Sequence, residues 1–108
     1  MTVKDLGERL TLQTLAPGDT ARCIASCYIS DLLSRVLGSC KEGDVWITVQ
    51  ASINMVAVAA MTGASCVILP EGLTAAENVI EKANEEGLTV FSSKETAFAL
   101  ATKLAELI

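Results

Sequence analysis

The sequence predicts an α/β domain on a mixed, mainly parallel sheet, with three successive strand-helix units flanked by helices. Two observations support this fold class. Short apolar segments alternate with helical patterns from Val45 to the end of the chain, and 51% of the 108 residues are hydrophobic, which is enough for a core. Strands that alternate with helices favour parallel pairing through right-handed crossovers. The length suits one domain, so we expect residues 1–108 to fold as a single unit.

The first part of the chain shows weaker patterns than the rest. Thr2 can cap a helix, and Pro17-Gly18-Asp19 is typical of a turn. In an extended segment Cys23, Ala25 and Cys27 would share one face. From the amino terminus we expect a helix over 3–10, a strand over 12–16, a strand over 21–28 and a short helix from Ser30-Asp31 to about Gly38.

The second part contains the three strand-helix units. Thr74 with Glu77, and Ser92 with Glu95, have the spacing of a capping box, which predicts where the last two helices begin. Gly63 and Gly87 are placed to end the helices before them. We expect strands over 45–50, 65–69 and 88–91, each followed by a helix that starts at Ser52, Thr74 or Ser92.

The helix expected from Ser52 to Thr62 is apolar on nearly all sides and contains no charged residue. One face can pack on the sheet, whereas the opposite face needs another cover, for which a second copy of the chain is the simplest candidate. Only 19% of the chain is charged, below the roughly 25% of typical domains. We therefore expect a homodimer whose interface includes Ile53, Val56, Ala57, Ala60 and Met61.

The chain contains no histidine, which excludes hydrolases with a histidine base and most zinc enzymes. It has neither a Walker A loop nor a Gly-x-Gly-x-x-Gly fingerprint. The four cysteines include no Cys-x-x-Cys pair and are expected to be reduced thiols. We expect no catalytic residues, no metal and no cofactor, and hence a non-enzymatic protein.

Charge and hydropathy limit the partners. The net charge is −5 and the eight basic residues are scattered, so nucleic acid is not an expected partner. The apolar run from Met55 to Met61 is shorter than the roughly 20 residues that a membrane span needs, and no signal-peptide pattern is present. We expect a cytoplasmic protein that binds a second copy of itself, and another protein of the same pathway is a further candidate partner.

Ligands of parallel α/β sheets usually lie beyond the carboxyl ends of the strands. That edge is polar here, although each of its residues could instead cap a helix. A small-ligand sensor, for a nucleotide-like molecule, is therefore the alternative to a regulatory or protein-interaction module. The candidate ligand-binding residues are Asp31, Thr48, Gln50, Ser52, Asn54, Glu71, Gly72 and Thr74.

Several segments together resemble the stand-alone DRTGG-domain proteins. They are Tyr28-Ile-Ser-Asp-Leu-Leu-Ser34, Lys41-Glu-Gly-Asp-Val-Trp-Ile-Thr48, Gln50, Asn54-Met-Val-Ala-Val-Ala59 and residues 77–91. The resemblance implies an α/β domain that tends to dimerise and is similar to the N-terminal domain of HPr kinase/phosphorylase. Some stand-alone members lie near iron hydrogenase genes, which implies a third alternative, a hydrogenase-associated accessory or redox protein.

The chain departs from this family pattern at two places. The Asp-Arg-Thr-Gly-Gly string is missing, and its nearest equivalents are Gln50-Ala-Ser-Ile53 and Leu69-Pro-Glu-Gly72. A histidine that the resemblance implies at the position of Ser52 is also absent. Both departures weaken the inference of nucleotide binding.

Overall fold

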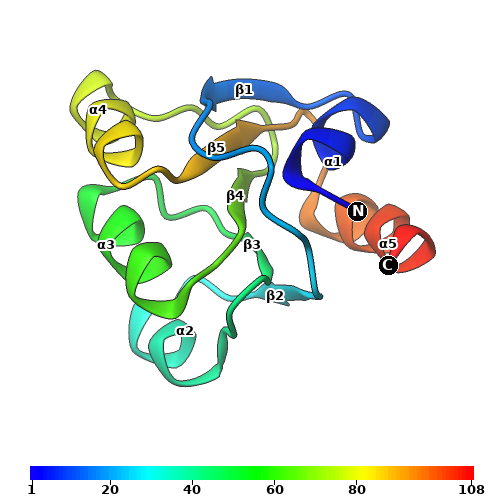
Figure 1. Cartoon of the computed structure of the whole chain (residues 1–108), viewed down its shortest axis with the longest axis horizontal. Helices are drawn as coiled ribbons and strands as arrows, with labels where there is room; N and C mark the ends of the chain where they lie inside the picture. Colours follow the sequence, from blue (N-terminus) through cyan, green and yellow to red (C-terminus); the bar gives the residue numbers. More distant parts are fainter.

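The computed structural model describes all residues from 1 to 108, and it places one sheet between two layers of helices (Figure 1). The helices are α1 (Val3–Arg9), α2 (Leu33–Ser39), α3 (Ile53–Thr62), α4 (Glu77–Glu85) and α5 (Ala97–Leu107). The strands are β1 (Gln13–Ala16), β2 (Cys27–Ile29), β3 (Val45–Ile47), β4 (Cys66–Leu69) and β5 (Thr89–Ser92). None of the helices is both long and apolar enough to cross a membrane.

The five strands lie in the order β1-β5-β4-β3-β2. The four strands from β2 to β5 pair in parallel, and β1 pairs antiparallel with β5 at one edge of the sheet. The predicted class of a mixed, mainly parallel sheet is confirmed, and the three expected strand-helix units are β3-α3, β4-α4 and β5-α5.

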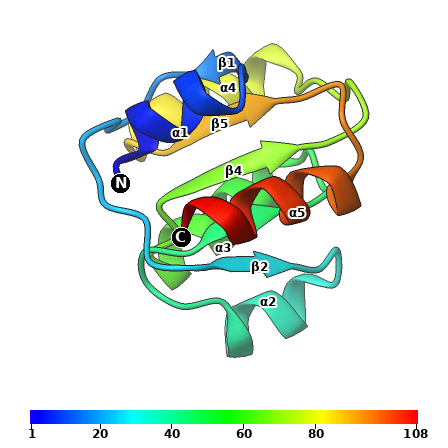
Figure 2. The same ribbon diagram turned by 90° about the vertical axis from the view of Figure 1, so that its right-hand side faces the viewer.

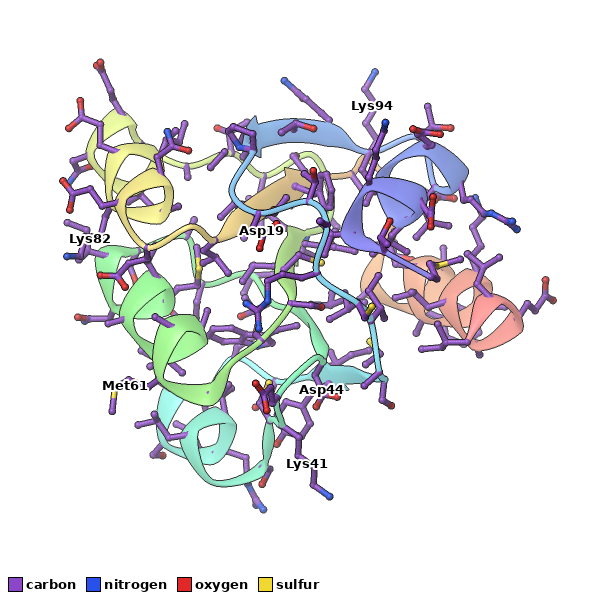
Figure 3. All side chains as sticks on the ribbon, in the orientation of Figure 1. Asp19, Lys41, Asp44, Met61, Lys82 and Lys94 are labelled. Atoms are coloured by element: carbon purple, nitrogen blue, oxygen red, sulfur yellow. The ribbon has the colours of Figure 1, made fainter.

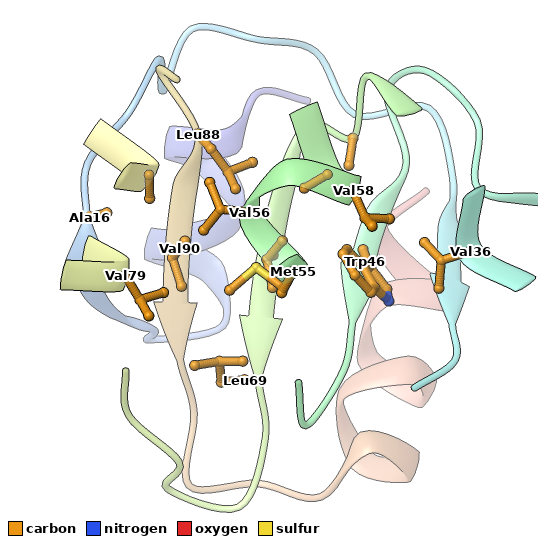
Figure 4. Close-up of a cluster of buried hydrophobic side chains, with 14 of the residues drawn as sticks. Ala16, Val36, Trp46, Met55, Val56, Val58, Leu69, Val79, Leu88 and Val90 are labelled. Carbon is orange, nitrogen blue, oxygen red and sulfur yellow. The ribbon is translucent and has the colours of Figure 1, made fainter. Parts of the chain in front are cut away.

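Alternation along the strands builds a separate core on each face of the sheet. Trp46 belongs to the cluster under α2, α3 and α4 (Figure 4), whereas its neighbours Val45 and Ile47 belong to the cluster under α1 and α5. The Trp46 Nε1 donates a hydrogen bond of 2.9 Å to the carbonyl of Ser30, so its one polar group is satisfied. The sheet is therefore buried on both faces, as parallel sheets usually are.

The chain changes faces after β5. The helices that follow β2, β3 and β4 all cover the first face, whereas α5 covers the opposite one together with α1. Consequently the loop after β4 and the loop after β5 leave neighbouring strands in opposite directions (Figure 2). Ligands of open α/β sheets usually lie at an edge where neighbouring loops diverge in this way.

The strand expected over 21–28 is much shorter in the structure. Only Cys27–Ile29 pairs with the sheet, so Cys23 and Ala25 do not share a strand face with Cys27. Before Cys27, the backbone of Arg22 and Ile24 forms hydrogen bonds with the amino-terminal segment instead of with the sheet. The amide of Val3 donates to the carbonyl of Arg22 at 2.9 Å, and that of Ile24 donates to Met1 at 3.0 Å.

Both expected capping boxes are wrong. Helix α4 begins at Glu77 after Ala76, with no side-chain cap, and α5 begins at Ala97 after Thr96, whose side chain accepts from the amide of Ala99. Ser92 cannot cap α5 because it is still the last residue of β5, in register with Leu69. Its hydroxyl instead donates to the carbonyl of Leu73 at 2.6 Å.

Candidate functional site

Three of the predicted ligand-binding residues meet where β2 and β3 end. The Oδ1 of Asp31 accepts hydrogen bonds from the Thr48 Oγ1 at 2.8 Å and from the amide of Val49 at 2.9 Å. The Nε2 of Gln50 donates to the Asp31 carbonyl at 2.9 Å, and the Gln50 amide donates to the Thr48 Oγ1 at 3.1 Å. These groups satisfy one another and line no cavity, so they fasten the loop before α2 to the end of β3.

The other residues predicted at this edge are not brought into that cluster. The Ser52 Oγ accepts the amide of Met55 at 3.2 Å, which makes Ser52 the cap of α3. Asn54 and Thr74 are exposed, and neither side chain has a hydrogen-bond partner in the chain. Glu71 and Gly72 lie in the loop after β4, at the second half of the edge.

A cleft of about 480 Å³ lies at that second half, beside the end of β5. Gly72 is the only one of the eight predicted residues that lines it. The other lining residues come from three segments: Leu10, Thr11 and Gln13 around the start of β1, residues 92–95 after β5, and Lys103 of α5. Gln13 is brought there because it pairs with Ser92 across the antiparallel edge.

Hydrogen bonds between the two diverging loops hold this cleft in shape. The amide of Glu71 donates to the carbonyl of Glu95 at 2.8 Å, and the amide of Gly72 donates to Ser93 at 2.7 Å. Thr11 (φ 52°) and Glu71 (φ 60°) are the two residues other than glycine with left-handed backbone, and they lie in or next to the lining. Such conformations persist only where their surroundings impose them, and they often occur at functional sites.

The cleft carries the opposite charge to the rest of the molecule. Lys94 and Lys103 both line it, whereas Glu95 is its only carboxylate. Glu95 pairs with Lys103, and Lys94 forms no ion pair. The two lysines and one glutamate give the lining a net charge of +1, in a chain of net charge −5. A small anion that enters this cleft would therefore meet a local excess of positive charge.

Ser93 adds a buried donor to the same cleft. The residue is 8% exposed, and its Oγ accepts the amide of Glu95 at 3.1 Å. No group of the chain accepts the hydroxyl proton. No ligand-binding role was predicted from the sequence for Ser93, Lys94, Lys103, Thr11 or Gln13. Ser93-Lys94 directly after a strand was the one signal that the sequence offered.

The apolar surface expected on α3 is present in part. Ile53 is 43% exposed and Met61 74% exposed, and Ala57 and Ala60 between them are exposed as well. The spacing i, i+4, i+7, i+8 places these four residues on one side of the helix, and we call them the α3 stripe. Met61 projects away from the sheet (Figure 3).

Val56 does not belong to this surface. It is 0% exposed and packs in the core under α3, so its assignment to an interface between copies is wrong (Figure 4). The buried side of α3 is formed by Met55, Val56, Val58 and Ala59, which leaves the stripe on the other side. The neighbouring helix α2 adds Leu37, and Leu32 just before it, to the exposed apolar residues.

All four cysteines are free thiols, and three are shielded from water. Burial raises the pKa of Cys66 from 9.0 to about 12, and burial together with the nearby Asp44 raises the pKa of Cys27 to about 11. Burial also raises the pKa of Cys40. Because the thiolate is the reactive form, these three thiols are poor nucleophiles at neutral pH, whereas Cys23 is exposed. No cluster of three or more Cys, Asp or Glu side chains is placed to hold a metal ion.

No curated protein matches the chain. Among solved structures, the fold is similar to the crystal structure of the CBS and DRTGG domains of the regulatory region of Clostridium perfringens pyrophosphatase, complexed with its activator diadenosine tetraphosphate. The identity is 17% and the TM-score 0.75, over 95% of this chain and 45% of that one, so the chain spans less than half of its neighbour's length. The sequence pattern of the DRTGG domain matches residues 14–107. The resemblance found in the sequence is thus confirmed, and the chain belongs to the DRTGG domain family.

Proposed function

We propose that the chain is a non-enzymatic regulatory module that works as a homodimer joined through the α3 stripe. The observation that carries this proposal is the exposure of Ile53, Ala57, Ala60 and Met61 on a helix that has no charged residue. Exposed apolar surface of this kind is stabilised when a partner removes it from water. The absence of histidine and the poorly reactive thiols support a role without catalysis.

The arrangement of the stripe suits a twofold axis. Ala57 and Ala60 at its centre are small enough to let a second helix approach closely, and the larger Ile53 and Met61 lie at its ends. In an antiparallel pair of α3 helices, Ile53 of one copy would contact Met61 of the other, and the reverse. Such a self-complementary contact is what a twofold dimer requires.

The regulatory part of the proposal is supported by the structural neighbour. That protein's DRTGG domain belongs to the regulatory region of a pyrophosphatase. A domain with this fold and without catalytic groups can control an attached or associated protein through its state of assembly. We therefore expect this chain to regulate an attached or associated protein through its state of assembly, monomer or dimer.

Light scattering coupled to gel filtration tests the dimer. The wild-type chain should elute with the mass of two copies, and Ala57→Glu should produce a monomer because it buries an unpaired carboxylate at the centre of the stripe. Ala105→Glu is the matched control, since Ala105 is an exposed alanine of α5 on the opposite layer. A wild-type monomer at micromolar concentration would overturn the proposal.

A second function, a small-ligand sensor at the carboxyl edge, is favoured by the cleft beside β5. Its position is the one that ligands usually take in open α/β sheets. The neighbour's regulatory region is complexed with diadenosine tetraphosphate, which makes that molecule a first candidate. A thermal-shift panel of diadenosine tetraphosphate, ATP, AMP and adenosine tests the idea. A ligand at about a hundred times its Kd should add about 2.7 kcal/mol of stability. No shift with any of them would count against a nucleotide sensor.

A further inference from the structure

We propose that the cleft beside β5 is a site for the carboxylate or phosphate group of a small molecule, with Lys94 and Ser93 as its principal donors. The inference rests on the sensor function proposed above and gives that sensor a ligand chemistry. It does not depend on the dimer, because the cleft and the α3 stripe involve different residues.

The position of the cleft is the first support. It lies beside the end of β5, between the segment that leads into β1, the loop after β5 and α5, with Gly72 of the loop after β4 also on its wall. The loops after β4 and β5 diverge toward opposite faces of the sheet (Figure 2). Backbone hydrogen bonds from the amide of Glu71 to the carbonyl of Glu95 and from the amide of Gly72 to the carbonyl of Ser93 fix the two loops together. The walls are therefore formed before any ligand arrives, which reduces the entropic cost of binding.

The available hydrogen-bond donors are the second support. Lys94 has no carboxylate partner, and Ser93 is buried with a hydroxyl proton that no group of the chain accepts. An oxyanion between them would accept a bond from each. Hydrogen bonds from an ammonium group to an anion are roughly twice as strong as neutral ones. Lys103 lines the same cleft and could reorient from Glu95 toward a bound anion.

The residues that line the cleft favour a charged group of a ligand over an aromatic ring. Leu10 is the one apolar residue of the lining, and no aromatic side chain contributes to it. A nucleobase would therefore find no ring to stack on. The volume of about 480 Å³ accommodates an anionic group together with a short polar remainder. A phosphorylated or carboxylated metabolite fits these walls better than a nucleoside.

NMR titration of amide signals tests the site with two probes, inorganic phosphate and acetate, against sodium chloride at equal ionic strength. The amides of Ser93, Lys94 and Gly72 should shift along a saturable curve with at least one probe. Phosphate alone would identify a phosphate site, and acetate alone a carboxylate site. Lys94→Gln should weaken binding about tenfold, the loss expected for one charge-assisted bond, and Ser93→Ala should weaken it as well.

The matched control is Lys82→Gln, which removes the charge of an α4 lysine far from the cleft (Figure 3) and should leave the affinity unchanged. Shifts that grow linearly without saturation, or equal affinity in Lys94→Gln and the wild type, would overturn the proposal. A thermal shift with uncharged adenosine, together with no response to phosphate or acetate, would overturn the anion chemistry while the sensor function still stood.

Discussion

Cys66 shows what burial does to a single titratable side chain. It lies in the central strand β4, within the core under α1 and α5, and is 0% exposed. Because the thiolate cannot be solvated there, the pKa of Cys66 rises from 9.0 to about 12. The folded protein therefore holds this proton more tightly than the unfolded chain does. As a result, the free energy of unfolding falls at alkaline pH.

We predict that Cys66 makes the folded state less stable as the pH rises from about 9 to about 12. Below pH 9 the thiol is protonated in both states, and above it only the unfolded chain releases the proton readily, so unfolding is favoured. Urea denaturation of wild type and Cys66→Val across this range checks the effect. The variant should lose less stability with pH than the wild type. Parallel pH profiles would contradict the pKa shift.

Asp31, one of the predicted ligand-binding residues, forms hydrogen bonds that we expect to stabilise the fold. The carboxylate accepts the hydroxyl of Thr48, which is 2% exposed and has no other acceptor. We predict that Asp31→Ala destabilises the fold by about 1–3 kcal/mol because it leaves the proton of that buried hydroxyl without an acceptor. Thr74→Ala, an exposed site without a side-chain hydrogen bond, should change stability by less than about 0.5 kcal/mol. Urea denaturation of the two variants measures both, and an Asp31→Ala variant as stable as the wild type would contradict the prediction.

At the scale of elements, α3 is defined at both ends by specific contacts. Ser52 caps its start, and Gly63 ends it with a left-handed backbone (φ 76°). The guanidinium of Arg22 then donates to the carbonyls of Gly63 and Ala64, at 2.8 Å each. A cation at this end also complements the helix dipole. The coil before β2 thereby helps to hold α3 against the sheet.

We predict that Ser52→Ala costs about 1 kcal/mol of stability, the usual loss for an N-cap serine. Thr96→Ala, at the cap of α5, should cost a similar amount, since Thr96 accepts the amide of Ala99 at 3.2 Å. By contrast Ser92→Ala should not act through helix capping. Helix content by circular dichroism during thermal melting, compared with the free energy of unfolding, distinguishes these cases. A Ser52→Ala variant as stable as the wild type would show that this cap does not contribute to the stability of the fold.

The sequence predicted those elements whose hydrophobic pattern can be recognised within the element itself. The apolar runs around β3, β4 and β5 and the helices after them stand out because both faces of a parallel sheet are buried. The segment 21–28 alternates like a strand, but Arg22 and Ile24 bond to the amino terminus, a long-range competition that hydrophobic periodicity does not report. Asp31 and Thr48 are both among the predicted ligand-binding residues, but their hydrogen bond could not be predicted without the parallel pairing of β2 with β3. Lys103 could not be placed in the cleft, because that required knowing that α5 crosses to the other face and that β1 is antiparallel.

At the scale of the whole molecule, the proposed dimer ties stability to concentration. A chain of net charge −5 repels its copies weakly at long range, whereas the uncharged α3 stripe attracts them at contact. We predict that the melting temperature of the wild type rises with protein concentration, because association stabilises the folded state. Ala57→Glu should melt at one temperature at all concentrations. Calorimetry over a wide concentration range measures both, and a concentration-independent wild type would contradict the dimer.

The antiparallel pairing of β1 with β5 also affects the order in which the sheet forms during protein synthesis. Strand β1 leaves the ribosome before the other four strands, yet its only neighbour in the sheet is β5, at residues 89–92. The earliest strand must therefore wait, unpaired, until the last of the five strands has been synthesised. Contacts between such distant residues form slowly. Closure of the cleft, which joins residues 10–13 to residues 92–103, is thus among the late events in the folding of this domain, and a nascent chain that lacks α5 could not assemble it.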